Sequence, residues 1–144
     1  MQHPIQIVFD ANDPARLADF WAVALGYVRQ PPPNGYDSWE AFALDREIPR
    51  DQWDAMDALI DPDGEGPRIL FQKVPEGKTA KNRVHLDVHV PGGHDLESEE
   101  RHRRVEALAA ELATAGAAEV DRFDEPTGWW IVMQDPEGNE FCVA

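Results

Sequence analysis

The sequence contains only one cysteine, Cys142, in 144 residues. An intrachain disulfide is therefore excluded, and the composition agrees with a reducing compartment. No segment approaches the roughly 18 consecutive apolar residues that predict a membrane-spanning helix. The first ten residues, MQHPIQIVFD, lack the basic segment and apolar core of a signal peptide. We therefore expect a cytoplasmic protein that has no membrane partner.

Positive charge is also scarce. Lysine and arginine number 13 against 28 aspartates and glutamates, which gives a formal net charge of −15. Nucleic acids and anionic membrane surfaces attract proteins mainly through basic side chains, so we expect neither as a partner. The sequence also lacks a P-loop, a dinucleotide-binding glycine fingerprint and a nucleophile elbow.

The rest of the composition is typical of a folded domain, with 42% apolar and 28% charged residues. At about 100–200 residues per domain, the length predicts a single domain over 1–144. A chain of this length buries enough surface to fold without a disulfide or a structural metal.

The first half begins with a strand signal, the apolar run Ile5–Phe9. Asp13 and Pro14 then provide an N-cap and a first helical residue, and apolar side chains at helical spacing predict a helix over Pro14–Leu25. Gly26 ends that helix. The segment Ala55–Ile60 is compatible with a strand or a short helix. The other strands expected in this half are Tyr27–Gln30, Trp39–Leu44 and Arg68–Val74.

A second half repeats this order after the polar linker Pro75–Asn82. Val84–Val90 alternates strictly and predicts a strand. A charged run from Glu97 to Arg104 opens a helix, which continues with an apolar stripe and ends at Gly116. The strands expected after it are Ala117–Phe123, Trp129–Gln134 and Glu140–Val143. The order predicts a duplicated architecture, with module 1 about 1–77 and module 2 about 78–144.

Two long segments and three short ones carry a family resemblance: NRVHLDV from Asn82, WIVMQDPEGNEFCV from Trp130, Asp13-Pro14, Phe20-Trp21 and Leu25-Gly26-Tyr27. They resemble the glyoxalase-like domains of the vicinal-oxygen-chelate (glyoxalase/bleomycin resistance/dioxygenase) superfamily. The resemblance implies an α+β fold in which two β-α-β-β-β modules form curled mixed sheets around a central cleft, with the helices outside. It also implies that a homodimer is possible.

The alternation of the two opening strands agrees with such a fold. In the first strand, Ile5, Ile7 and Phe9 are expected to face the helix, which leaves Gln6 and Asp10 toward the cleft. Polar side chains that face inward are typical of a lined pocket.

The second opening strand divides in the same way. Leu86 and Val88 are expected to face the helix, whereas His85, Asp87 and His89 face the cleft. The three polar residues form either a metal-binding group or a polar pocket wall in which Asp87 fixes a histidine tautomer.

The resemblance also implies positions for a metal. The metal enzymes of the superfamily use four side chains, and these positions correspond here to Gln6, Gln72, His85 and Cys142. Relatives that bind a metal have a glutamate where Cys142 stands, and Glu140 lies two residues earlier. Two neutral amides and one thiol are poor ligands for a divalent cation, so His85 is the best single candidate and we commit to no metal cofactor.

Further candidates are aromatic or nucleophilic. Trp129 and Trp130 are adjacent on a strand, so one of them is expected to line the cleft, and Trp39 is a second aromatic candidate. Cys142 would be a nucleophile only with a base beside it, for which His85 is the candidate, and a buried structural thiol is the simpler interpretation.

Two functions remain open. The favoured one is a small-molecule binding protein without a catalytic metal, which holds an aromatic or apolar metabolite or drug. The alternative is a metal-dependent lyase, isomerase or dioxygenase acting on vicinal oxygens, with His85, Asp87 or Glu140 as catalytic candidates. The expected ligand-binding residues are Gln6, Asp10, Trp39, Gln72, His85, Asp87, Trp130 and Cys142.

Overall fold

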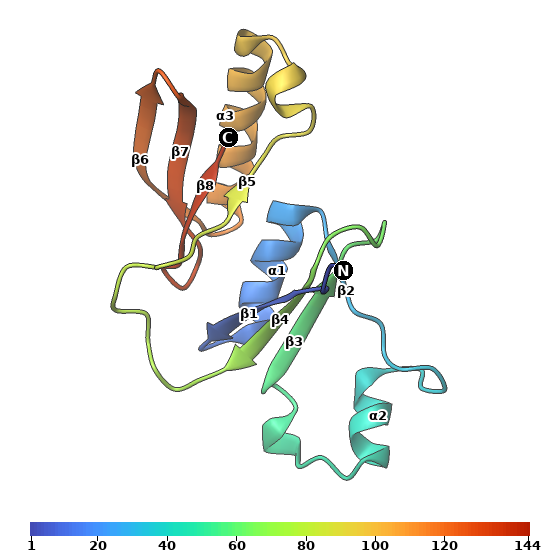
Figure 1. The fold of residues 1–144 in the computed structure, drawn as a ribbon. Helices are drawn as coiled ribbons and strands as arrows, with labels where there is room; N and C mark the ends of the chain where they lie inside the picture. Colours follow the sequence, from blue (N-terminus) through green and yellow to red (C-terminus); the bar gives the residue numbers. More distant parts are fainter. The chain divides into compact units, whose positions relative to one another are not determined.

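The computed structural model describes residues 1–144, with three α-helices and eight strands (Figure 1). In chain order they are β1 (Gln6–Ala11), α1 (Pro14–Leu25), β2 (Val28–Arg29), α2 (Trp39–Asp45), β3 (Met56–Ile60), β4 (Arg68–Lys73), β5 (Asp87–Val88), α3 (Ser98–Thr114), β6 (Ala118–Glu125), β7 (Gly128–Gln134) and β8 (Glu140–Val143). Short 3₁₀ turns lie at Arg50–Gln52 and Gly93–Asp95. None of the helices is long and apolar enough to cross a membrane.

The chain forms two compact units, each with one four-stranded sheet. Unit 1 comprises Met1–Ala22 and Gly26–Gly77, and unit 2 comprises Lys78–Ala144 together with Val23–Leu25. The strand orders are β1-β4-β3-β2 and β5-β8-β7-β6. In both sheets the first strand pairs parallel with the last, and the other pairs are antiparallel. The predicted α+β class and the duplicated β-α-β-β-β order are thus confirmed.

Helix α1 has the predicted bounds because both of its ends carry strong local signals. The Asp13 side chain accepts a hydrogen bond from the backbone N–H of Arg16 at 3.2 Å, and Pro14 follows at the first helical position. At the other end Gly26 adopts a left-handed φ of 67°, which glycine tolerates without strain.

The apolar face of α1 packs on the sheet of unit 1. The ring of Phe9 lies 5.1 Å from that of Trp21 and 5.4 Å from that of Phe71, and both partners are fully buried. Gln6 and Asp10 alternate with Phe9 along β1 and are exposed on the opposite face. The predicted division of faces is therefore correct for Gln6, Phe9 and Asp10, whereas Ile5, which was also expected to face the helix, precedes β1 and is 72% exposed.

The strand predicted over Trp39–Leu44 is wrong, because this segment is helix α2. Ser38 caps it by accepting a hydrogen bond from the N–H of Ala41 at 3.0 Å. Trp39 and Phe42, three residues apart, lie edge to face on the same side of the helix. The ambiguous segment at Ala55–Ile60 is a strand, β3.

In unit 2, helix α3 lies against β6, β7 and β8 and buries Val105, Ala109 and Leu112 (Figure 1). The predicted apolar stripe is thereby confirmed. After the helix, Gly116 has a φ of 118°, a conformation that favours glycine.

The strand predicted over Val84–Val90 is much shorter in the structure, where β5 comprises only Asp87 and Val88. It is an edge strand that pairs only with the four-residue β8, so few ladder positions exist. Val88 and Val90 are buried, whereas Asp87 and His89 are exposed. The alternation therefore predicted the faces correctly from Asp87 to Val90 and overestimated the length of the strand, since Val84 lies outside β5 and is 80% exposed.

Candidate functional site

The pairing of β5 with β8 sets the positions of the polar groups in unit 2. Asp87 lies opposite Cys142 in a parallel ladder, and directly paired residues project to the same side of a sheet. The ladder continues on either side of this pair, with the Cys142 N–H donating to the carbonyl of Leu86 at 3.0 Å. The backbone therefore brings together two side chains that are 55 residues apart in the sequence.

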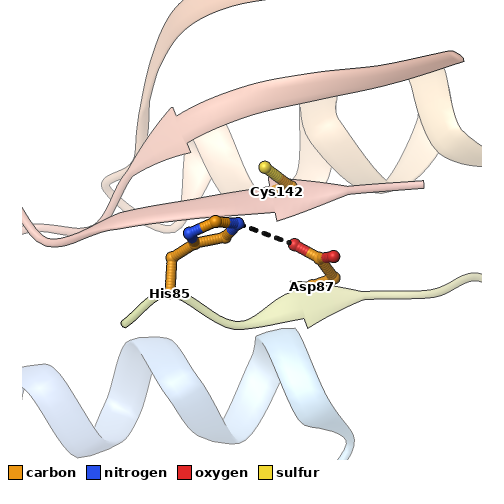
Figure 2. A group of neighbouring side chains, drawn as sticks. All are labelled: His85, Asp87 and Cys142. Atoms are coloured by element: carbon orange, nitrogen blue, oxygen red, sulfur yellow. Dashed lines mark ion pairs between the residues drawn. The ribbon is translucent and has the colours of Figure 1, made fainter. Parts of the chain in front are cut away.

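His85 joins this pair and completes a three-residue cluster. Its Nε2 lies 3.4 Å from Oδ1 of Asp87, and the potential ligand atoms of His85, Asp87 and Cys142 all lie within 4.8 Å of one another (Figure 2). His85 and Asp87 are half-exposed, whereas Cys142 is buried. His89, which lies two residues after Asp87 on the same side of the segment, is not part of the cluster.

The thiol of Cys142 is held in its neutral form. Burial, reinforced by the nearby Asp87 carboxylate, raises the pKa of Cys142 to about 11. At neutral pH the side chain is then almost entirely a protonated thiol, which is a weak nucleophile and a weak metal ligand.

Glu140 is already engaged by the segment that precedes the cluster. Its carboxylate lies 3.1 Å from Nζ of Lys78 and accepts a hydrogen bond from the N–H of Asn82 at 3.1 Å. Partial burial raises the pKa of Glu140, but these partners outweigh it and the pKa lies below the usual value. Glu140 is consequently ionised at neutral pH and fixed in place.

The two adjacent tryptophans of β7 point to opposite faces. Trp130 pairs with Phe123 of β6, and the two rings stack at 5.5 Å with an interplanar angle of 20°. Trp129 instead lies against His102 of α3, with ring centroids 4.1 Å apart. Trp130 therefore presents its ring on the face that α3 does not cover.

These groups surround one cavity of about 630 Å³. The expected site residues that line it are His85, Asp87, Trp130, Glu140 and Cys142. His89 and Trp129, which was the alternative to Trp130, also contribute to the lining. Sequence reasoning missed several other lining residues: Lys81, His94, Arg101, Val120, Val132 and Gln134. For Val132 and Gln134, the period-two alternation from Trp130 is a signal that identifies the shared face.

His94 and Arg101 were missed for a different reason. His94 is exposed, yet it lines the cavity beside Arg101, whose Nη1 lies 3.3 Å from Nδ1 of His94. The two residues come from a 3₁₀ turn and from the first turn of α3. No periodic pattern connects such positions.

The remaining expected residues belong to unit 1. Asp10 and Gln72 are direct neighbours in the β1–β4 ladder, and Gln6 lies opposite Arg68. Trp39 lies in α2, where its indole N–H donates to the carbonyl of Gln30 at 2.9 Å.

The four residues that the family resemblance suggested as metal ligands do not fit a divalent cation well. The Oε1 atom of Gln6 already accepts a hydrogen bond from Nη1 of Arg68 at 2.7 Å, which places a permanent positive charge beside it. Cys142 carries a proton that a metal would have to displace. The cluster of His85, Asp87 and Cys142 offers a better donor set, since two of its three members are standard zinc ligands in their resting forms.

Comparison with known proteins gives a family and a fold. The protein-family model described as a glyoxalase-like domain matches residues 6–144. Several solved structures are similar at low sequence identity. One is a glyoxalase/bleomycin resistance protein/dioxygenase family enzyme from Burkholderia phytofirmans PsJN, with 14% identity, a TM-score of 0.62, and coverage of 96% of this chain and 94% of that chain.

Two further structures have related folds. The fosfomycin resistance protein FosX from Mesorhizobium loti has 10% identity and a TM-score of 0.60, over 99% of this chain and 90% of that chain. The bleomycin-binding protein from Streptomyces verticillus, solved with copper(II)-bleomycin, has 16% identity and a TM-score of 0.53. The match covers 100% of this chain and 96% of that chain. No curated protein sequence matches the chain.

Proposed function

The chain belongs to the glyoxalase-like domain family, and on that premise we propose that it binds an aromatic or apolar small molecule in the cavity of unit 2 without a catalytic metal. The wider vicinal-oxygen-chelate superfamily includes both metal-dependent enzymes and ligand-binding resistance proteins. The choice between them therefore depends on the residues of this cavity.

The observation that carries the proposal is the aromatic wall formed by the ring of Trp130, which lines the cavity and is itself stacked with Phe123. Val120 and Val132 extend this wall as apolar neighbours in the same cavity. Flat apolar ligands gain from stacking on such rings, and a few polar groups opposite them fix orientation. His85 and Asp87 provide those polar groups. The structural similarity to a protein solved with bleomycin is in keeping with this use of the fold.

A neutral aromatic probe tests the proposal directly. We expect N-phenyl-1-naphthylamine to increase its fluorescence on binding the wild-type protein. Trp130→Ala should weaken that binding about tenfold, because an aromatic contact and the burial around it are lost. Trp53→Ala removes an indole from unit 1 and is the matched control, with binding unchanged. Equal binding by both variants would contradict the proposal.

A metal-dependent enzyme is the second candidate, and the cluster of His85, Asp87 and Cys142 is the observation that favours it. A divalent ion held there would polarise vicinal oxygens of a substrate. Of the catalytic candidates, His85 and Asp87 would then be ligands, so Glu140 would remain as the base. Its ionised state suits that role, but its contacts with Lys78 and Asn82 restrain it.

Metal analysis distinguishes the two candidates. From protein purified without chelator, we expect no stoichiometric zinc or manganese, because the cluster has one protonated thiol and two half-exposed partners. Calorimetric titration with Zn²⁺ should likewise give the same weak signal for the wild type and for His85→Ala. One equivalent of tightly bound metal that disappears in His85→Ala would establish the second candidate instead.

A further inference from the structure

Arg68 stands at the start of β4 and is held by two neutral side chains. Its Nε donates to Oε1 of Gln30 at 2.6 Å, and its Nη1 donates to Oε1 of Gln6 at 2.7 Å. The side chain is partly buried. The two acceptors come from β1 and from the residue that follows β2, and together they fix the plane of the guanidinium group.

Arg68 takes part in no ion pair. Arg16, Arg46 and Arg50 of unit 1 form no ion pair either, but these three are exposed, whereas Arg68 is half-buried and held by two neutral acceptors. Because a guanidinium group has five N–H donors and two are used, three remain: one on Nη1 and two on Nη2.

The surface beside Arg68 is apolar. In the parallel register Gln6 lies opposite Arg68, and Val8 lies opposite Leu70, the next pair on the same face. The Val8 side chain is 48% exposed, and Leu70 is half-buried. A fixed cation therefore lies next to an exposed aliphatic surface, on the face of the sheet opposite α1.

We propose that Arg68 forms a binding site for the carboxylate of a small aliphatic acid, whose hydrocarbon part lies on Val8 and Leu70. The rigid fork of guanidinium N–H groups matches the two oxygens of a carboxylate. A monoanion fits better than a dianionic phosphate, because a single arginine offsets one charge and the chain already carries a net charge of −15. This site lies in unit 1 and takes a ligand of different chemistry from the cavity of unit 2.

The proposal is tested by NMR titration with hexanoate, and with hexanamide as the uncharged analogue. We expect hexanoate to shift the Nε–Hε resonance of Arg68 and the methyl resonances of Val8 and Leu70. Arg68→Gln should weaken hexanoate binding at least about tenfold, since a charge-assisted bidentate contact is lost. Arg16→Gln removes the same charge from α1, on the other side of the sheet, and should leave binding within about twofold of wild type.

The alternative outcomes are distinct. Equal binding of hexanamide, or unchanged binding in Arg68→Gln, would overturn the carboxylate site. Shifts confined to residues of unit 2 would overturn it as well, while leaving the cavity proposed for aromatic ligands intact. Arg68→Lys keeps the charge and loses the fork, so intermediate affinity is expected. That variant also tests the site if Arg68→Gln does not fold.

Discussion

Replacing Trp21 by alanine is expected to lower the free energy of unfolding by about 3–5 kcal/mol, the range for loss of a large aromatic side chain from a core. Trp21 is 1% exposed, and its ring lies 5.1 Å from Phe9 and 5.5 Å, edge to face, from Phe20. Removing it leaves a hole between α1 and the sheet of unit 1. Because small domains have total stabilities of about 5–15 kcal/mol, the variant should unfold at much lower urea concentration.

The control for this measurement is Trp39→Ala. Trp39 is 45% exposed, makes one hydrogen bond to the carbonyl of Gln30 and meets the ring of Phe42 edge to face. Its replacement should cost about 1–2 kcal/mol. Trp21→Phe keeps a ring between Phe9 and Phe20 and should be intermediate. A loss for Trp21→Ala no larger than that for Trp39→Ala would contradict the central position of Trp21 in the core.

The elements that the sequence predicted well are those whose signals are local. Helix α1 is delimited by Asp13, Pro14 and Gly26, and each of these acts within one turn of the helix end. The sequence signals that predict β8 and the turn before it are equally local. There Asp135 accepts hydrogen bonds from the backbone N–H groups of Glu137 and Asn139.

The predictions that failed involved competing or distant signals. Trp39–Leu44 contains aromatic residues that favour strands, but the cap at Ser38 and the contact of Trp39 with Phe42 stabilise a helix instead. For Val84–Val90, alternation indicates which side chains face the core but does not determine how long the strand is. The length of β5 depends on its pairing with β8, which lies more than 50 residues away in the sequence.

The candidate site was predictable to the extent that it follows strand alternation. Alternation placed His85 and Asp87 on one face, and both line the cavity. It left open which of Trp129 and Trp130 would line the cavity, and both do, whereas the position of Cys142 came from the family resemblance. Arg68 was not predictable, because its partners Gln6 and Gln30 lie 62 and 38 residues away and nothing in the local sequence marks it. Its neutral environment is visible only in three dimensions.

The second large effect is expected in the rate at which Cys142 is alkylated. At pH 8, iodoacetamide should react with Cys142 in the folded protein about 100-fold more slowly than in protein unfolded by urea. The pKa of the thiol is raised to about 11 from an ordinary value of 9.0, and each unit reduces the thiolate fraction about tenfold. Steric protection of the buried sulfur adds to this effect. The rate is measured by mass spectrometry over time at several pH values.

The same shift makes stability depend on pH in a defined direction. The unfolded thiol loses its proton at a lower pH than the folded thiol, so the unfolded state binds fewer protons between pH 9 and about pH 11. The stabilisation contributed by the neutral thiol is therefore complete below pH 9 and declines as the pH rises through this window. Cys142→Ala should reduce the decline.

Asp87→Asn separates the two causes of the shift. It removes the carboxylate but leaves the burial, which is the larger cause, so alkylation should become faster than in wild type and remain slower than in the unfolded chain. Rapid alkylation of the wild type near neutral pH, lost in His85→Ala, would contradict the neutral thiol. It would instead identify His85 as a base that activates Cys142 as a nucleophile. The cavity of unit 2 would then be a reaction site, and not only a binding site for an aromatic ligand.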